Sequence, residues 1–122
     1  MNESQLQQSI VMHYNNNYCL KNMNPRGLIL AIPNGGSRHF LEAKNLKATG
    51  LLAGASDLIL ITPEGKLIFI ELKAEKGIQS EVQKIFEERV KNLNFDYFII
   101  RSLEDFKTLI DNQQPNIKKI IV

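Results

Sequence analysis

LIFIELK, at residues 67–73, is the stretch from which the predicted fold follows. Its first four residues are an uninterrupted apolar run, the pattern of a strand buried on both faces of a sheet. The run leads directly into Glu71 and Lys73, although a buried carboxylate or ammonium group is costly unless it is paired. The sequence therefore predicts a core strand whose end carries charged groups in need of partners.

The residues before this strand are predicted to form a hairpin with it. Asp57–Thr62 is a second apolar segment, and a turn rich in proline and glycine separates the two. If this turn is centred on Glu64, Asp57 lies opposite Glu71, and a slip of one residue would move one of them to the other face. Glu71 and Lys73 share a face, with Cα atoms roughly 6.6 Å apart. Two carboxylates and a lysine are thus expected to converge at one end of the sheet.

The rest of the chain alternates between helical and strand patterns, which predicts a mixed α/β sheet flanked by helices. We expect helices over residues 2–14, 40–48, 80–93 and 103–111, and further strands over residues 27–32, 96–100 and 117–122. The polar cluster Asn15-Asn16-Asn17 is interpreted as a turn after the first helix.

The helix over residues 80–93 has the clearest pattern in the chain. Ser80 and Gln83 have the spacing of a capping box, in which each side chain bonds the backbone of the other. Its predicted core stripe comprises Val82, Ile85, Phe86, Val90 and Leu93.

Size and composition are those of an ordinary globular domain. The chain has 122 residues, of which 43% are apolar and 23% charged, so we expect a single domain over residues 1–122. The net charge of +2 permits nucleic-acid binding without requiring it. A single cysteine excludes a disulfide framework and a thiolate zinc site, which favours a reducing, cytoplasmic setting. No apolar stretch reaches the roughly 18 to 20 residues that span a bilayer, so no membrane partner is expected.

The predicted cluster of Asp57, Glu71 and Lys73 suits a divalent metal. Two carboxylates this close repel each other, and a cation removes that conflict. Oxygen ligands suit Mg²⁺ or Mn²⁺, which bind through one or two carboxylates, waters and substrate phosphate. Such an ion can lower the pKa of a bound water and polarise a phosphodiester, while the lysine orients the water or stabilises charge on the phosphate.

These residues resemble a known nuclease pattern. Asp57, thirteen intervening residues and then Glu71-Leu72-Lys73 look like the PD-(D/E)XK nuclease core. Over about residues 3–105 the chain more specifically resembles the VRR-NUC (virus-type replication-repair nuclease) family. The further motifs of that resemblance, in order, are Asn34-Gly35-Gly36-Ser37-Arg38, Gly50, Gly54-Ala55-Ser56-Asp57 and Ser80 through Gln83.

The resemblance implies a restriction-endonuclease-like fold and a set of site residues. A divalent metal would be held by Asp57, Glu71 and the backbone carbonyl of Leu72, with Glu3 reaching the metal shell, Lys73 as catalytic lysine and Gln83 in support. Small stand-alone members of the family, often viral, are similar to junction resolvases that act as homodimers. Ser56 stands where the family usually has proline, a change that affects only the stiffness of the chain before the strand.

Three residues are candidate DNA contacts. Arg38 follows a glycine-rich turn, where the backbone can approach a phosphate and arginine can grip it. Lys76 and Ser80 follow the charged strand and are further candidates. Each also has a plain interpretation as an exposed polar residue, just as Gln83 can be a cap alone and Glu3 can simply favour the helix N-terminus.

The leading prediction is a Mg²⁺- or Mn²⁺-dependent endonuclease that hydrolyses branched DNA such as four-way junctions. Two symmetric nicks need two sites, so a homodimer is expected, with the apolar end Ile120-Ile121-Val122 as a candidate edge. Two alternatives stay open: a non-catalytic DNA-binding module on a nuclease fold, and a restriction-type endonuclease. The intact acidic and lysine residues argue against the first, and the small size against the second.

Overall fold

The computed structural model of the chain describes residues 1–33 and 47–113. At its centre is a four-stranded sheet in the order β1-β2-β3-β4. The strands are β1 (Leu28–Ala31), β2 (Leu58–Ile61), β3 (Leu67–Leu72) and β4 (Asp96–Ile100). The first three pair antiparallel, whereas β3 and β4 run parallel. The predicted mixed sheet is confirmed.

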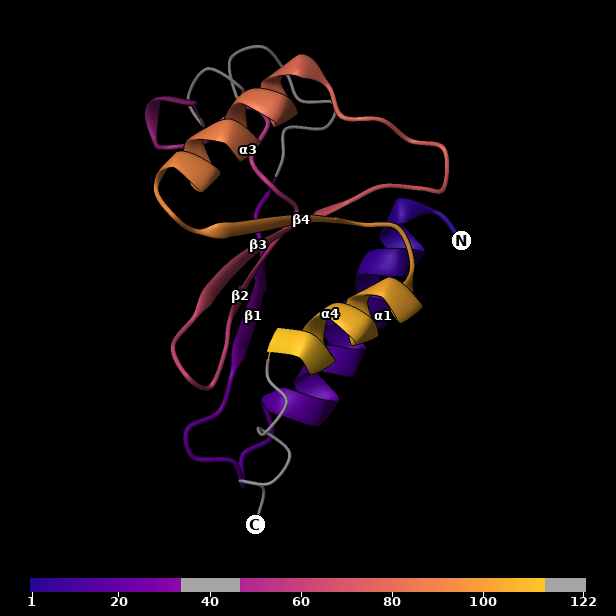
Figure 1. Cartoon of the computed structure of the whole chain (residues 1–122), viewed down its shortest axis with the longest axis vertical. Helices are drawn as coiled ribbons and strands as arrows, with labels where there is room; N and C mark the ends of the chain where they lie inside the picture. The colour runs from indigo at the N-terminus through magenta and orange to yellow at the C-terminus, as the bar shows by residue number, and fades with distance from the viewer. Residues whose placement is uncertain (34–46, 114–122) are drawn as a thin grey trace.

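Helices cover both faces of this sheet (Figure 1). Helices α1 (Glu3–Tyr18) and α4 (Leu103–Gln113) lie together on one face, and α3 (Glu81–Asn92) lies on the other. None of the helices in the described ranges is both long and apolar enough to cross a membrane.

The main core lies between the sheet and the helix pair. It is built from alternate side chains of β2 and β3 and from one stripe of each helix. The buried members from the helices are Leu6, Ile10, Tyr14, Tyr18, Phe106 and Ile110. A smaller cluster under α3 contains Ala55, Phe86, Val90 and Tyr97.

The hairpin has the predicted register. Its ladder pairs Leu58 with Ile70 and Ile61 with Leu67, so the turn is centred on Glu64. Extending the ladder by one residue places Asp57 opposite Glu71. The convergence of charged groups at the end of β3 thus follows from the register.

The interpretation of Asn15-Asn16-Asn17 as a turn is wrong, because α1 continues through it to Tyr18. Tyr18 is 1% exposed, and its ring stacks on that of Tyr14 at 5.1 Å. Burial of this aromatic ring outweighs the weak helix propensity of the three asparagines.

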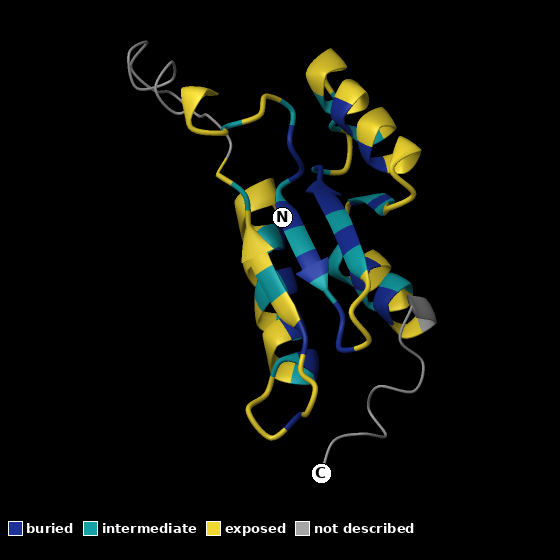
Figure 2. Cartoon of the chain, turned by 90° about the vertical axis from the view of Figure 1, so that its left-hand side faces the viewer, coloured by how far each residue is buried: buried dark blue, intermediate teal, exposed yellow. Residues whose placement is uncertain are grey.

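The predicted core stripe of α3 is also partly wrong. Only Phe86 and Val90 are buried, while Val82, Ile85 and Leu93 are 47%, 56% and 69% exposed. In Figure 2 most of the outer surface of this helix is exposed. Within residues 1–33 and 47–113, α3 is the one helix on this face of the sheet, and it buries only one side of its apolar stripe.

The ends of several elements differ slightly from the prediction, and some strands are one residue shorter at an end than expected. Helix α4 begins after Ser102, as expected, and the Ser102 hydroxyl accepts a hydrogen bond from Asp105 N–H at 3.1 Å. Residues 40–46 of an expected helix, the expected strand over 117–122 and Arg38 lie outside the described residues.

Candidate active site

The site begins where β2 and β3 end together. Asp57 immediately precedes β2, and its Oδ2 accepts a hydrogen bond of 2.7 Å from the backbone N–H of Leu72. Ser56, just before it, is fully buried, and its hydroxyl donates to the Leu58 carbonyl at 3.3 Å. These bonds hold the Asp57 carboxylate against the end of β3.

Glu71 and Lys73 lie on the face of the sheet that α3 covers, where their side chains meet Gln83. The Gln83 amide donates from Nε2 to Glu71 Oε2 at 2.7 Å, and its Oε1 accepts from Lys73 Nζ at 2.9 Å. Nζ itself lies 3.6 Å from Glu71 Oε2. Because Glu71 is 1% and Lys73 9% exposed, these charges are largely removed from water. One amide therefore bridges a buried carboxylate and a buried ammonium.

The first turn of α3 fixes this amide. Ser80 is the N-cap: its Oγ accepts from Gln83 N–H at 3.3 Å, and its own N–H donates to Gln83 Oε1 at 2.9 Å. The predicted capping box is confirmed, and the same glutamine oxygen also serves Lys73. The cap and the site contact are therefore a single arrangement.

Gly54 lets the loop before Asp57 approach that same helical turn. Its φ is +82°, and a Cβ there would lie 2.2 Å from the Val82 carbonyl oxygen and 2.9 Å from Gln83 N. Only glycine can occupy this position without displacing one backbone from the other. The loop carrying Asp57 and the helix carrying Gln83 are thus packed directly together.

Electrostatics at Glu71 are unfavourable for a charged side chain. Burial raises the pKa of Glu71 from 4.5 to about 7, with a further rise from the Asp57 carboxylate. Lys73 opposes this effect through its charge and a hydrogen bond, while Glu3 adds a smaller rise. Glu71 Oε1 is buried and has no hydrogen-bond partner. The carboxylates of Asp57 and Glu71 together carry more negative charge than Lys73 compensates.

The donor atoms fit a divalent cation. Two neighbouring carboxylates, one with a buried unpartnered oxygen, are the hard oxygen donors that Mg²⁺ and Mn²⁺ prefer. Across residues 1–33 and 47–113 no three acidic, histidine or cysteine side chains group closely enough to hold an ion by themselves. Asp57 and Glu71 would accordingly be completed by backbone oxygen, water or substrate phosphate, as is usual for Mg²⁺.

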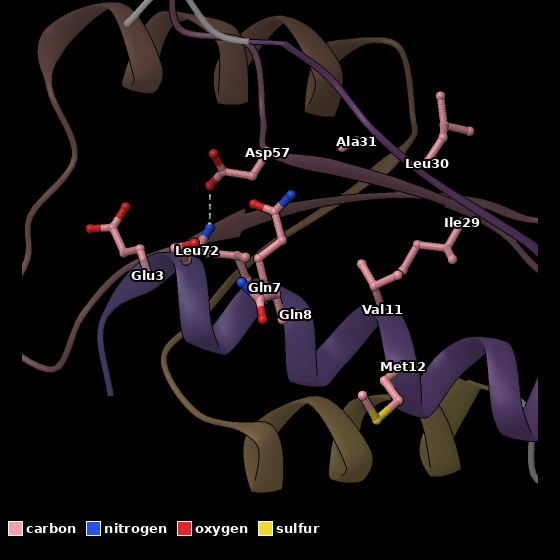
Figure 3. A pocket seen from close by; sticks show the side chains of 11 residues that line it. Glu3, Gln7, Gln8, Val11, Met12, Ile29, Leu30, Ala31, Asp57 and Leu72 are labelled. Atoms are coloured by element: carbon pink, nitrogen blue, oxygen red, sulfur yellow. Dashed lines mark hydrogen bonds between the residues drawn. The ribbon is translucent and has the colours of Figure 1, made fainter.

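An open groove of about 840 Å³ runs from this site between α1 and β1. Figure 3 shows Glu3, Asp57 and Leu72 at one end, with Gln7 and Gln8 beside them. The groove continues along apolar side chains of α1 and β1, namely Val11, Met12, Ile29 and Leu30. Glu3 therefore faces the same groove as Asp57 without joining it in a three-carboxylate group among the described residues, and its place in the metal shell stays a prediction.

The structure describes two of the three predicted DNA contacts, Lys76 and Ser80. Lys76 is exposed in the segment between β3 and α3, and Ser80 is exposed at the start of α3. The role that the structure gives to Ser80 is that of a cap for Gln83. Arg38 belongs to the residues that are not described.

Arg101 is a residue near the site that the sequence did not indicate. It follows β4, and its Nη1 donates to the carbonyl oxygens of Gly77, Ala74 and Glu75 at 2.7, 3.0 and 3.3 Å. These partners lie in the segment that follows Lys73. No local motif links residues so far apart, so only the parallel pairing of β3 with β4 could have suggested the contact.

Comparison with known proteins agrees with this geometry. Residues 1–104 match the model of the VRR-NUC domain family. A solved structure described as a VRR_NUC domain protein shares 17% sequence identity, with a TM-score of 0.70, over 98% of this chain and 90% of its own. Another, described as a VRR_NUC domain, shares 21% identity, with a TM-score of 0.61, over 89% of this chain and 94% of its own. No curated protein matches the sequence.

The family match covers most of the chain, and both solved structures have the same α/β nuclease-like fold. The predicted fold class and the predicted resemblance are both confirmed. This chain belongs to the VRR-NUC domain family, a family of nuclease domains.

Proposed function

We propose that the chain is a Mg²⁺- or Mn²⁺-dependent endonuclease that hydrolyses phosphodiesters in branched DNA, including four-way junctions. The observation that carries this proposal is the buried group of Glu71, Gln83 and Lys73 beside the Asp57 carboxylate. It combines surplus negative charge, an unpartnered carboxylate oxygen and a positioned ammonium group. Membership of a nuclease family supports the reaction class.

The carboxylates of Asp57 and Glu71 and the carbonyl of Leu72 would hold the metal ion, with Glu3 near them in the groove. When bound, such an ion supplies Lewis-acid chemistry: it lowers the pKa of a bound water and offsets charge on the phosphate. A cation would also oppose the rise in the pKa of Glu71 that burial and the neighbouring Asp57 carboxylate cause. The carboxylate would then be ionised at neutral pH.

Lys73 acts on the substrate side of the reaction. Its ammonium group is held within 2.9 Å of Gln83 Oε1, so it has little freedom to move. From there it orients the attacking water by donating a hydrogen bond, or stabilises the charge that develops on the phosphate oxygens. Preorganised donors in a desolvated site are effective because they need no rearrangement during the reaction.

Gln83 is a positioning residue in this scheme. Its amide fixes the separation of Glu71 and Lys73, and Ser80 fixes the amide through the cap. Loss of the bridge would leave the buried Glu71 and Lys73 side chains with too few hydrogen-bond partners, so their positions would no longer be fixed.

A homodimer is part of the proposal. Resolution of a four-way junction needs two nicks, and each chain carries one site, so a two-fold pair matches the symmetry of the substrate. The C-terminal residues 120–122 that suggested an interface lie outside the described part of the chain. Sedimentation at micromolar concentration tests this point: a monomer that still resolves junctions contradicts it.

The activity is tested with a labelled four-way junction and a linear duplex of the same sequence in Mg²⁺, Mn²⁺ or EDTA, using wild type and Asp57→Ala. We expect metal-dependent cleavage of the junction by wild type and none by the variant. Binding without cleavage in either metal would favour the DNA-binding module. Defined cuts in the linear duplex would favour a restriction-type enzyme.

A further inference from the structure

Residues 74–79, in the middle of the connection between β3 and α3, project beyond the sheet (Figure 1). It contains a turn closed by a hydrogen bond of 2.9 Å from Gly77 N–H to the Ala74 carbonyl. Three of its carbonyl oxygens converge on one nitrogen of Arg101, at 2.7, 3.0 and 3.3 Å. Convergent carbonyl dipoles repel one another, so a cation at their focus is what holds the turn in this shape.

The base of this turn is part of the sheet and touches the candidate active site. Lys73 N–H donates to the Ile100 carbonyl at 3.1 Å, which continues the pairing of β3 and β4 up to the turn. A methyl group added at Gly77 would lie 3.4 Å from Cδ of Lys73. The turn is therefore built on the sheet and packs against the stem of the lysine.

Ile78 projects from this fixed segment. It is 82% exposed, the most exposed large apolar side chain among the described residues. A single exposed isoleucine is unremarkable on its own. Here the turn just before it is held by the Arg101 contacts, the last of them at the Gly77 carbonyl. Ile78 also lies two residues before Ser80, whose N–H donates to Gln83 Oε1. Two residues span at most about 7 Å, so Ile78 sits at the margin of the site.

Building on the proposed function, we propose that residues 74–79 are a DNA-contacting turn in which Ile78 is an apolar wedge for an interruption in the base stack. Apolar side chains of this kind enter between base steps in proteins that distort DNA. In a continuous duplex the wedge must first unstack a step, which costs free energy. At a branch point the stack is already interrupted, so the same side chain can fill the gap without that cost.

This role supplies selectivity that charge alone cannot. Lys76, exposed in the same turn, can contact a phosphate, but phosphates are present in linear and branched DNA alike. Ile78 distinguishes the two because it responds to the state of the stack. Arg101 acts as its positioning residue, since a wedge on an unrestrained turn would fold back onto the protein surface.

The test measures binding of the full chain, in EDTA, to a four-way junction and to a linear duplex of the same sequence, each with 2-aminopurine at the position of the branch. The variants are Ile78→Ala and Arg101→Ala, with Leu93→Ala as a matched control. Leu93 is 69% exposed at the opposite end of α3. Thermal melts establish that each variant is folded.

We expect Ile78→Ala to bind the junction about tenfold more weakly, because several buried methyl and methylene groups are lost from the contact. Duplex binding should change less than about twofold, since phosphate contacts are retained. Wild type should change the fluorescence of 2-aminopurine at the branch, because an inserted side chain alters the surroundings of that base, and Ile78→Ala should leave the fluorescence unchanged. Arg101→Ala should show both the weaker junction binding and the missing fluorescence change, and Leu93→Ala should show neither.

If Ile78→Ala loses the same affinity for junction and duplex, or loses affinity for neither, Ile78 is not a wedge. The proposal of a junction-selective nuclease is unaffected by that result. Normal selectivity in Arg101→Ala overturns the positioning role. If wild type itself binds junction and duplex equally, the junction substrate of the proposed function fails and the wedge fails with it.

Discussion

Replacement of Glu71 by glutamine is expected to stabilise the metal-free protein at alkaline pH while abolishing cleavage. The side chain is 1% exposed, and its pKa is raised from 4.5 to about 7 by burial and by Asp57. Between those two pH values the folded protein holds a proton that the unfolded chain has lost. Stability therefore falls as the pH rises from 4.5 through 7, and the full cost remains above 7.

The size of the effect follows from the shift. At about 1.4 kcal/mol per pH unit, the ionised carboxylate costs the folded state about 3 kcal/mol at pH 8 and less than about 1 kcal/mol at pH 5. Glutamine has a similar shape and does not ionise, so Glu71→Gln should recover this free energy. For a domain of this length the gain at pH 8 corresponds to a rise in Tm of about 10 °C.

The assay is urea unfolding in EDTA at pH 8 and pH 5, with Glu64→Gln as control because Glu64 is exposed in the hairpin turn. The stabilisation should be large at pH 8, small at pH 5 and absent in the control. Mg²⁺ at pH 8 should stabilise wild type and leave Glu71→Gln unchanged. If the variant is no more stable than wild type at pH 8, or if the difference in stability does not depend on pH, ionisation of Glu71 does not destabilise the folded protein.

Three further substitutions test how the site is held. Gly54→Ala places a Cβ 2.2 Å from the Val82 carbonyl oxygen at a φ of +82°. We therefore expect the unfolding free energy to fall by about 2 kcal/mol or more and cleavage to slow. Unchanged stability would contradict the close approach of the two backbones. Ser80→Ala should lower the unfolding free energy by about 1 kcal/mol through loss of the cap, and it should slow cleavage because Gln83 is no longer held. Ser80→Thr should restore both stability and cleavage. Normal cleavage in Ser80→Ala would show that the cap does not position Gln83. Lys73→Met should abolish single-turnover cleavage while weakening DNA binding by no more than about tenfold, since one phosphate contact at most is lost. Residual cleavage near the wild-type rate would remove Lys73 from the mechanism.

The centre of the fold and of the site could be predicted because it depends on local periodicity. Alternation along β3 determines that Glu71 and Lys73 share a face, and the turn centred on Glu64 sets the register that brings Asp57 to them. The capping box was equally local, since Ser80 and Gln83 lie within one helical turn. Such features are specified by neighbours in the sequence.

What could not be predicted depends on how the elements pack. Tyr18 extends α1 because it finds a place in the core, although the residues before it favour a turn. The apolar side chains of α3 exceed what one face of the sheet can cover, so Ile85 remains exposed. The contacts of Arg101 join segments more than twenty residues apart and arise only once β3 and β4 pair. The hydrophobic periodicity of the sequence does not indicate contacts between segments that are so far apart.

We propose that Asp57 and Glu71 together hold a catalytic divalent cation. This site can be measured by titrating the full chain with Mn²⁺ and following the free ion by electron paramagnetic resonance, with Asp57→Ala and Glu64→Gln measured alongside. We expect one tight Mn²⁺ site per chain in wild type and Glu64→Gln, and loss of that site in Asp57→Ala. Equal Mn²⁺ binding by wild type and Asp57→Ala, or no tight binding by wild type, would contradict this proposal.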